Sequence, residues 1–359
     1  MKILTIIGAR PQFIKAAIVS KKMKESNFIS EIIVHTGQHF DLNMDKIFFD
    51  ELSIPAPKYN LGINSVSHGE MTGRMIIEIE KIILLEKPDF VLVYGDTNST
   101  LAGALAAKKL HMKIIHVEAG LRSFNMNMPE EINRILTDRI SDILFCPTQT
   151  SVNNLVQEGY KNFGCEIVQN GDVMYDLALF MQKMNSVKED DKKDSKKFVL
   201  CTIHREESTD NIKNLNSIFN ALNRISREVD IFLPLHPRTK AKLKNNFNLN
   251  FKTHEPVGYF QMANLLANCS LVITDSGGLQ KEAFFYKKNC VTIREQTEWQ
   301  ELINGGFNML SGYDENDIYN SFREMISRTN NFNVDLYGNG NACQIIVNTL
   351  LRYNSQNSK

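Results

Sequence analysis

The sequence predicts an α/β protein with two parallel sheets, helices on both faces of each sheet and a cleft between the two halves. Three observations support this prediction. Short apolar, β-branched runs alternate with longer stretches of helical period, as in parallel sheets built from strand and helix units. The alternation stops at a charged stretch, residues 185–197, and then resumes. The length of 359 residues also fits two domains.

The first half of the chain contains four expected strands and the helices between them. The strands are residues 2–8, 31–37, 89–96 and 113–120. The helices are residues 12–24, a segment from about residue 42, and residues 68–88 and 99–110. Almost all the strand residues are apolar, which is typical of strands that are buried on both faces.

The second half repeats the pattern after the charged stretch. Its expected strands are residues 198–206, 230–237, 270–278 and 289–295, and its expected helices are residues 211–225, 260–269 and 279–288. We therefore predict one domain at 1–184, a linker at 185–197 and a second domain at 198–340. Open α/β sheets bind ligands beyond the carboxyl ends of their strands, so we expect both sheets to face the cleft with those ends.

Charge and composition exclude several classes of protein. The chain has 41 lysines and arginines and 41 aspartates and glutamates, so we expect no nucleic-acid or membrane partner. We find no signal peptide and no apolar run near the ~18 residues that a membrane span needs. The six cysteines lack metal-binding spacing, and we expect them to be reduced in a cytoplasmic protein.

Several familiar motifs are missing from the sequence. It has no GxGxxG after a strand, no GxxxxGK followed by Ser or Thr, and no GxSxG. Their absence argues against hydride transfer, nucleoside triphosphate hydrolysis and an α/β-hydrolase. His35 and His39 are four residues apart, but the turn HTGQH argues against a shared metal ion. We expect neither a metal nor a cofactor.

Basic and small residues after the strands are candidates for binding a phosphate. Ser276, Gly277 and Gly278 directly precede an expected helix, whose free N–H groups favour an anion. The alternative there is a tight turn with Ser276 as N-cap. Arg10 and Lys15 lie near the start of the first helix, where two cations are unfavourable without an anion or acid. We expect Arg10 to meet a phosphate, and a solvated surface lysine is the alternative for Lys15.

A second group of candidates is acidic. Asp96 follows one expected strand, with helix capping as the alternative, a role for which Thr97 also qualifies. Glu118 follows a fully apolar strand, where a carboxylate without a partner would be desolvated. Glu130 and Glu131 stand in the first turn of an expected helix. They could act on a substrate or only compensate the helix dipole.

Seven motifs together resemble one family. In order, they are GARPQFIK, HTGQHFD, GDTNST, HVEAGLRS, PEEINR, HRE and TDSGGLQKEA. With compatible spacing over residues 1–312, they are similar to the non-hydrolysing UDP-N-acetylglucosamine 2-epimerases. The resemblance implies a glycosyltransferase-B-like fold of two Rossmann-like domains, with residues 341–359 forming a helix that packs back on the first domain. It also implies a homodimer.

The family reaction inverts C2 of a UDP-linked 2-acetamido sugar, by anti elimination of UDP to a glycal followed by syn re-addition. Such sugars supply surface polysaccharides. The resemblance assigns catalysis to Asp96, Glu118, Glu130 and His204. It assigns UDP binding or support of catalysis to Arg10, Lys15, Arg134, His236, Ser276, Gly277, Gly278 and Glu282. We expect Glu282 to accept the ribose hydroxyls, and an exposed helical glutamate is the alternative.

Two segments depart from the family pattern. Trp299, in TEWQE, stands where many members have the arginine of TERPE. This segment, GDVMYD and KEAFFY are more similar to the branch acting on UDP-2,3-diacetamido-2,3-dideoxy-glucuronate, which is the alternative substrate. Gln38 is kept, but Phe40 and Asp41 differ from members that a second UDP-N-acetylglucosamine activates, so we do not assume such activation.

Three other functions stay open at this point. A UDP-dependent glycosyltransferase would use the same UDP site but would need an acceptor pocket. A hydrolysing epimerase would release free sugar. A UDP-sugar-binding module without catalysis would be stabilised by ligand and show no turnover.

Overall fold

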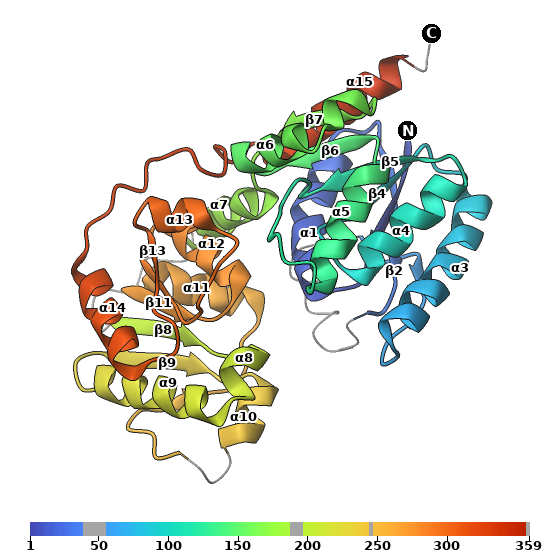
Figure 1. Ribbon diagram of the computed structural model, residues 1–359. Helices are drawn as coiled ribbons and strands as arrows, with labels where there is room; N and C mark the ends of the chain where they lie inside the picture. The colour runs from blue at the N-terminus through green and yellow to red at the C-terminus, as the bar shows by residue number, and fades with distance from the viewer. Residues whose placement is uncertain (39–54, 187–196, 244–246, 357–359) are drawn as a thin grey trace. The chain divides into compact units, whose positions relative to one another are not determined.

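The computed structural model describes residues 1–38, 55–186, 197–243 and 247–356. It forms two compact units, unit 1 at Met1–Leu177 with Asp335–Lys359 and unit 2 at Ala178–Val334 (Figure 1). The boundaries differ from the predicted 184 and 340. The first falls inside a helix, and the second comes early because a hydrogen bond of 2.9 Å from Asp172 N to Tyr337 O ties the returning chain to unit 1. The helix expected from about residue 42 and most of the predicted linker lie outside the described residues.

Unit 1 contains a seven-stranded parallel sheet with strand order β3-β2-β1-β4-β5-β6-β7. Its strands are β1 (Lys2–Ile7), β2 (Ser30–His35), β3 (Tyr59–Asn60), β4 (Phe90–Tyr94), β5 (Lys113–Val117), β6 (Ile143–Cys146) and β7 (Glu166–Gln169). Its helices include α1 (Arg10–Glu25), α3 (His68–Glu86), α4 (Asn98–Lys109), α5 (Pro129–Ile140), α6 (Gln149–Gln157), the 3-10 turn η1 (Tyr160–Asn162) and α7 (Val173–Ser186). The four strands predicted for this half are all present.

The centre of this sheet is apolar on both faces, as the sequence predicts. Strands β1 and β4 pair from Ile3 opposite Phe90 to Ile6 opposite Val93, and all four of these side chains are buried. Helix α4 approaches this pair through Gly103. A Cβ at Gly103 would lie 3.1 Å from side-chain carbons of Ile6 and Val93. The small residue therefore lets α4, which carries a candidate carboxylate just before its N-terminus, lie close to the sheet.

Unit 2 contains a six-stranded parallel sheet with strand order β10-β9-β8-β11-β12-β13. Its strands are β8 (Phe198–Thr202), β9 (Asp230–Pro234), β10 (Thr253–His254), β11 (Leu271–Thr274), β12 (Cys290–Thr292) and β13 (Asn308–Leu310). Its helices include α8 (Glu206–Thr209), α9 (Ile212–Ile225), α10 (Pro237–Leu243), α11 (Tyr259–Asn268), α12 (Gly277–Phe285), α13 (Gln300–Asn304) and α14 (Glu315–Ser327). The predicted α/β class with two parallel sheets is confirmed.

The last helix, α15 (Ala342–Gln356), packs on unit 1. The half-buried carboxylate of Asp176 accepts hydrogen bonds from Ala342 N at 3.1 Å and Cys343 N at 2.8 Å, which satisfies two free donors at the helix start. At the other end, the Tyr353 ring packs edge-on against Phe90, with centroids 5.7 Å apart. The helix is therefore fixed at both ends.

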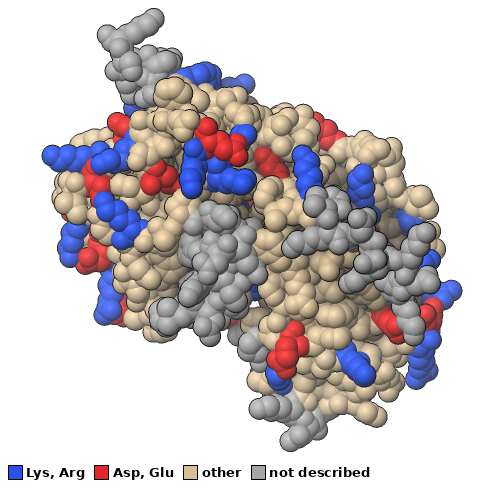
Figure 2. Space-filling model, turned by 180° about the vertical axis from the view of Figure 1, so that it is seen from behind, with Lys and Arg blue, Asp and Glu red and all other residues tan. Residues whose placement is uncertain are grey.

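The surface carries mixed charge. On the face shown in Figure 2, acidic and basic side chains are interspersed, as expected for a chain with no net charge. No helix among the described residues combines the length and apolar character that crossing a membrane requires.

Glu31, on β2, gives unit 1 a pH-dependent contribution to stability. Burial raises the pKa of its carboxyl from 4.5 to about 7, and hydrogen bonds from Thr5 and Ser20 offset only part of this shift. Because the folded-state pKa is raised, the contribution is fully present below about pH 4.5 and is lost as the pH rises through 7. We expect Glu31→Gln to increase the free energy of unfolding by about 2 kcal/mol at about pH 8.5 and to change it little at about pH 4.5.

Urea denaturation at these two pH values measures this effect. The exposed Glu25, which pairs with Lys22, provides the control. Glu25→Gln is expected to change stability by less than ~0.5 kcal/mol at either pH. An equal effect of Glu31→Gln at both pH values would contradict the raised pKa.

Candidate active site

Two candidate carboxylates lie at the carboxyl edge of the unit 1 sheet. Asp96 follows β4 and Glu118 follows β5, which are neighbouring strands. Thr97, rather than Asp96, is the N-cap of α4, and its hydroxyl accepts a hydrogen bond of 3.3 Å from Thr100 N. The capping alternative for Asp96 is therefore wrong, and its carboxylate is available for other contacts.

Arg134, on α5, joins Asp96 to a second carboxylate. Its Nη2 lies 2.5 Å from Asp96 Oδ2 and its Nη1 lies 2.6 Å from Glu131 Oε2. Burial would lower the pKa of Arg134, but Asp96, Glu131 and Glu118 raise it above its ordinary value. The side chain of Asp96 is 29% exposed, so the Asp96 carboxylate of this ion pair remains accessible to solvent.

Glu118 pairs with Lys15 of α1. Its Oε2 contacts Lys15 Nζ, and the two side chains are only 10% and 13% exposed. The alternative of a solvated surface lysine is therefore wrong. A Cβ at Gly95 would lie 3.3 Å from the same Oε2, so the pair borders the Gly95–Asp96 backbone. Glu118 itself has φ +76°, a strained value for a residue with a Cβ and one often found at functional sites.

The structure separates the roles of Glu130 and Glu131. Glu131 is fully buried, accepts hydrogen bonds from Ser123 N at 2.9 Å and Phe124 N at 2.9 Å, and binds Arg134. Burial alone would raise the pKa of Glu131, but these donors hold it below its ordinary value. Glu131 thus orders the loop before α5. Glu130 is exposed in the first turn of the same helix.

We call Asp96, Glu118, Glu131, Lys15 and Arg134 the acid cluster. It contains three carboxylates and two cations, so one negative charge is uncompensated. A group of this kind can accept a proton from a carbon acid and can stabilise positive charge on a sugar ring.

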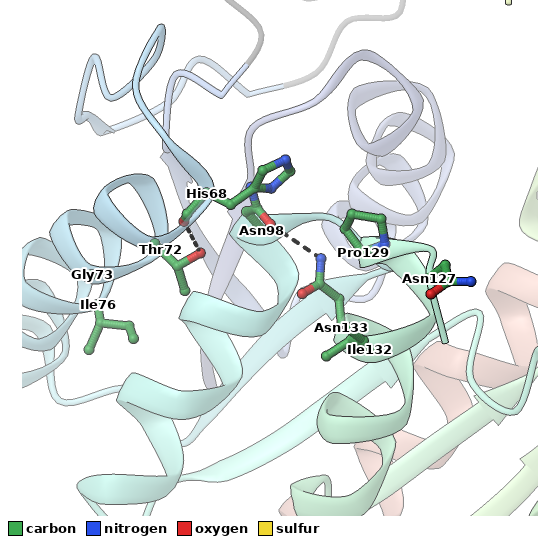
Figure 3. A pocket seen from close by; sticks show the side chains of 10 residues that line it. His68, Thr72, Gly73, Ile76, Asn98, Asn127, Pro129, Ile132 and Asn133 are labelled. Carbon is green, nitrogen blue, oxygen red and sulfur yellow. Dashed lines mark hydrogen bonds between the residues drawn. The ribbon is translucent and has the colours of Figure 1, made fainter. Parts of the chain in front are cut away.

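A cavity of about 560 Å³ in unit 1 is lined by residues of α3, α4 and α5 (Figure 3). Asn98 and Asn133 contact each other in its lining, where Asn133 Nδ2 lies 3.3 Å from Asn98 Oδ1. The same nitrogen donates a hydrogen bond of 2.9 Å to the carbonyl of Asp96. His68 and Ile132 line other sides of the cavity. Asn133 therefore connects the lining of the cavity to the backbone of Asp96.

In unit 2, Asp275 organises the residues that follow β8. It is fully buried after β11, and its Oδ2 accepts hydrogen bonds from His204 N at 2.8 Å and Arg205 N at 2.9 Å. Its Oδ1 lies 3.3 Å from His204 Nδ1. The His204 side chain is 37% exposed, and its ring lies 5.6 Å from that of His236, measured between centroids.

Next to Asp275 lies the N-terminus of α12. The hydroxyl of Ser276 lies 3.5 Å from Leu279 N and caps the helix, so its capping role is confirmed. The N–H groups of Gly277 and Gly278 in the first turn then remain as donors to an anion. We call Ser276, Gly277, Gly278, His204 and Arg205 the phosphate seat.

Glu298 and Trp299 enclose the phosphate seat. A Cβ at Gly277 would lie 2.4 Å from Glu298 Oε1 and 3.4 Å from Arg205 Nη2. Burial alone would raise the pKa of Glu298, but Arg294, 3.0 Å away, and Arg205 hold it below its ordinary value. The indole of Trp299 donates a hydrogen bond of 3.0 Å to the Gly277 carbonyl. The tryptophan that departs from the TERPE pattern thus fixes the first turn of α12.

A family model described as UDP-N-acetylglucosamine 2-epimerase matches residues 21–351. The chain belongs to this family. Among its relatives, a UDP-2,3-diacetamido-2,3-dideoxy-D-glucuronate 2-epimerase from Pseudomonas aeruginosa is 55% identical over 98% of this chain and 100% of the relative. A UDP-N-acetylglucosamine 2-epimerase from Methanocaldococcus jannaschii is 43% identical over 98% of this chain and 99% of the relative.

Solved structures of epimerases share the fold. The M. jannaschii UDP-GlcNAc 2-epimerase in complex with UDP-GlcNAc and UDP has a TM-score of 0.87 and 42% identity, covering 98% of this chain and 100% of that one. The Neisseria meningitidis UDP-GlcNAc 2-epimerase bound to UDP-GlcNAc has a TM-score of 0.84 and 30% identity, with 98% and 100% covered. The glycosyltransferase-B-like class is therefore the fold of this chain.

The remaining residues predicted for the epimerase site are placed as follows. Arg10 is the first residue of α1, Glu282 is half-buried on α12, and His236 is exposed after β9. Residues 40 and 41, on which the activation argument depends, lie outside the described part, whereas Gln38 Oε1 accepts a hydrogen bond of 3.0 Å from Ser99 N.

Gln12 is a structural residue of the epimerase motifs that the sequence analysis missed. Gln12, within GARPQFIK, is buried and its Oε1 accepts hydrogen bonds from Gly8 N at 2.8 Å and Ala9 N at 3.0 Å. Its Nε2 donates to Tyr94 O at 2.8 Å. Gln12 therefore ties the ends of β1 and β4 together. A polar residue on the apolar face of the first helix was the signal that could have found it.

Proposed function

We propose that the protein is an isomerase that reversibly inverts C2 of a UDP-linked 2-acetamido sugar. The observation that carries this proposal is the acid cluster. Its carboxylates and cations lie at the carboxyl edge of the unit 1 sheet, and the sequence motifs that resemble the family come directly after the strands of that sheet. A glycosyltransferase needs no base for a C2 proton. Family membership and the relatives named above support the same reaction.

The reaction takes place in two steps, elimination of UDP and its re-addition. A carboxylate removes the C2 proton, the C–H electron pair forms the C1=C2 double bond, and the C1–O bond breaks to release UDP. UDP then adds again to C1 of the 2-acetamidoglucal, and a proton returns to C2 on the other face. Asp96, Glu118 and Glu130 supply the acid and base groups, and His204 acts near the leaving phosphate.

UDP is bound by unit 2 in this proposal. The diphosphate occupies the phosphate seat, where helix N–H groups and Arg205 stabilise negative charge as the C1–O bond breaks. His236 adds to this site, and Glu282 accepts the ribose hydroxyls. Arg10 contacts the phosphates, while Lys15 and Arg134 fix the charge of the acid cluster. No cofactor takes part in this proposal.

We propose UDP-2,3-diacetamido-2,3-dideoxy-glucuronate as the preferred substrate, with UDP-N-acetylglucosamine as the alternative. The 55% identity to the P. aeruginosa relative, against 43% to the M. jannaschii relative, supports this preference. Either product would serve surface polysaccharide synthesis. Nuclear magnetic resonance of the anomeric protons during incubation with each compound tests the proposal. A mixture of two UDP-linked epimers is expected, whereas free sugar or no change would contradict it.

We also propose that the protein is a homodimer that acts in the cytoplasm. All six cysteines are free, which supports a reducing compartment. Helices α3 and α5 expose apolar side chains that a second copy would cover, namely Ile77, Leu84, Leu85, Ile132 and Leu136.

Light scattering after size exclusion tests the dimer. We expect a mass of twice 41.0 kDa for the protein and 41.0 kDa for Leu84→Glu/Leu85→Glu. Exposed Ile212, on α9 of unit 2, gives a control, since Ile212→Glu is expected to leave the mass unchanged. A monomeric wild-type protein would contradict this assignment.

A further inference from the structure

His116, on β5, is a completely buried histidine whose two ring nitrogens both face oxygen atoms. Nε2 lies 2.7 Å from the carbonyl oxygen of Gly95, and Nδ1 lies 2.7 Å from Asp138 Oδ1 on α5. A carbonyl oxygen can only accept a hydrogen bond, so Nε2 must carry a hydrogen. Asp138 Oδ2 accepts a hydrogen bond from Arg122 Nη1, so Asp138 Oδ1 and His116 Nδ1 share one hydrogen between them.

The His116–Asp138 pair is part of a larger hydrogen-bonded network. Arg122 Nη1 lies 2.7 Å from Asp138 Oδ2, and Arg122 forms two hydrogen bonds of 2.7 Å to the carboxylate oxygens of Glu158. Arg122 thus lies between two carboxyl groups, those of Asp138 and Glu158. Buried charges are tolerated when they are paired and hydrogen-bonded in this way.

This network contacts the backbone next to two carboxylates of the acid cluster, at Gly95 before Asp96 and at Gly120 after Glu118. Gly95, whose carbonyl His116 binds, has φ +62° and directly precedes Asp96. Gly120, whose N–H donates a hydrogen bond of 3.1 Å to Asp138 Oδ2, has φ +77° and ends the turn that begins at Glu118. Glu118 has φ +76°, which costs a residue with a Cβ about 1 kcal/mol and persists only where the surroundings enforce it.

We propose that His116 and Asp138 are positioning residues, which hold the backbone of Asp96 and Glu118 in the arrangement that C2 proton transfer requires. The inference rests on the proposed function for the identity of the reaction. It adds two residues that do not contact substrate. They connect the loop after β4 to the loop after β5, so that loss of the bond from His116 Nε2 to the Gly95 carbonyl separates the carboxylates without altering the phosphate seat of unit 2.

Two substitutions of His116 separate positioning from simple stability. The amide nitrogen of glutamine reaches near the place of Nε2 and can still donate to Gly95 O, whereas that of asparagine lies near Nδ1 and can donate only to Asp138. With whichever UDP-sugar the wild-type enzyme epimerises, we expect His116→Asn to lower kcat roughly 10- to 100-fold, with KM and UDP affinity changed by less than about twofold. His116→Gln is expected to retain kcat within about threefold of the wild-type value.

Ile115→Val is the matched control, because Ile115 is a fully buried neighbour on the same strand and has no part in the network. It is expected to cause a small loss of stability and no change in kcat. Unchanged kcat in His116→Asn, or equal losses in the asparagine and glutamine variants, would overturn the inference. A wild-type enzyme without epimerase activity would instead overturn the proposed function.

The wild-type protein offers a second test that needs no variant to fold. Nuclear magnetic resonance of protein labelled with ¹⁵N-histidine reports whether each ring nitrogen carries a proton. The chain has eight histidines, of which His35 and His116 are buried among the described residues, and slow exchange of a ring proton is expected for His116. A proton-bearing Nε2 is expected for His116, because the Gly95 carbonyl can only accept. A signal with a bare Nε2 would overturn the bridge between Gly95 and Asp138, whether or not the enzyme is active.

Discussion

Replacing Asp96 by asparagine is expected to lower kcat by at least ~100-fold. The variant loses a charged group that can accept the C2 proton or stabilise positive charge on the sugar ring. Its side-chain oxygen can still accept the hydrogen bond from Arg134, which lies 2.5 Å away, so the fold of the cluster is retained. UDP affinity, measured by calorimetry, is expected to change less than about twofold because the phosphate seat belongs to unit 2. Steady-state kinetics with the epimerised UDP-sugar gives kcat.

Asp142 offers the matched control for this prediction. It is also a unit 1 carboxylate after α5, but it caps Ile114 N at the opposite end of β5, at 2.8 Å. Asp142→Asn is therefore expected to leave kcat unchanged. If Asp96→Asn turned over substrate at the wild-type rate while it bound UDP normally, Asp96 would have no part in the chemistry.

Replacing Gly277 by alanine is expected to weaken UDP binding roughly 10- to 100-fold, the effect of losing one or more hydrogen bonds to a charged group. The new methyl group would lie 2.4 Å from Glu298 Oε1. Glu298 is held by Arg294 at 3.0 Å, so it can move only by breaking that pair. The methyl group also covers the first turn of α12, where the diphosphate is proposed to bind.

Gly258 provides the control for the alanine substitution. It is the N-cap of α11, in the same unit, and no atom of the described residues lies within 4 Å of a Cβ built there. Gly258→Ala is expected to leave the dissociation constant of UDP unchanged in calorimetry. Equal affinities for wild-type protein and Gly277→Ala would place the diphosphate elsewhere.

The long apolar strands were predictable because each is buried on both faces and lies between clear helical periods. Five further strands in the described part of the chain were not predicted. Strands β3 and β10 have two residues each and are defined only by pairing with a neighbour, and β6, β7 and β13 have only three or four residues. The domain boundaries were also missed. The charged stretch suggested a linker, but the contact of Asp172 with Tyr337 that returns the chain to unit 1 leaves no local signal.

The candidate site was predictable as a set of residue types and not as a set of contacts. The sequence placed Lys15 and Glu118 after different strands, and only the tertiary structure shows that they pair. It could not distinguish Glu130 from Glu131, because adjacent residues at a helix start share the same local preference. His116 and Asp138 passed unnoticed, since a histidine inside an apolar strand reveals its role only through its partners.

The most direct test of the proposed chemistry is the fate of the C2 hydrogen when the wild-type enzyme converts its UDP-sugar in deuterated water. Proton transfer through the acid cluster predicts that the C2 proton signal is lost from both epimers while the sugar stays linked to UDP. Interconversion of the two epimers with the original hydrogen retained at C2 would contradict it.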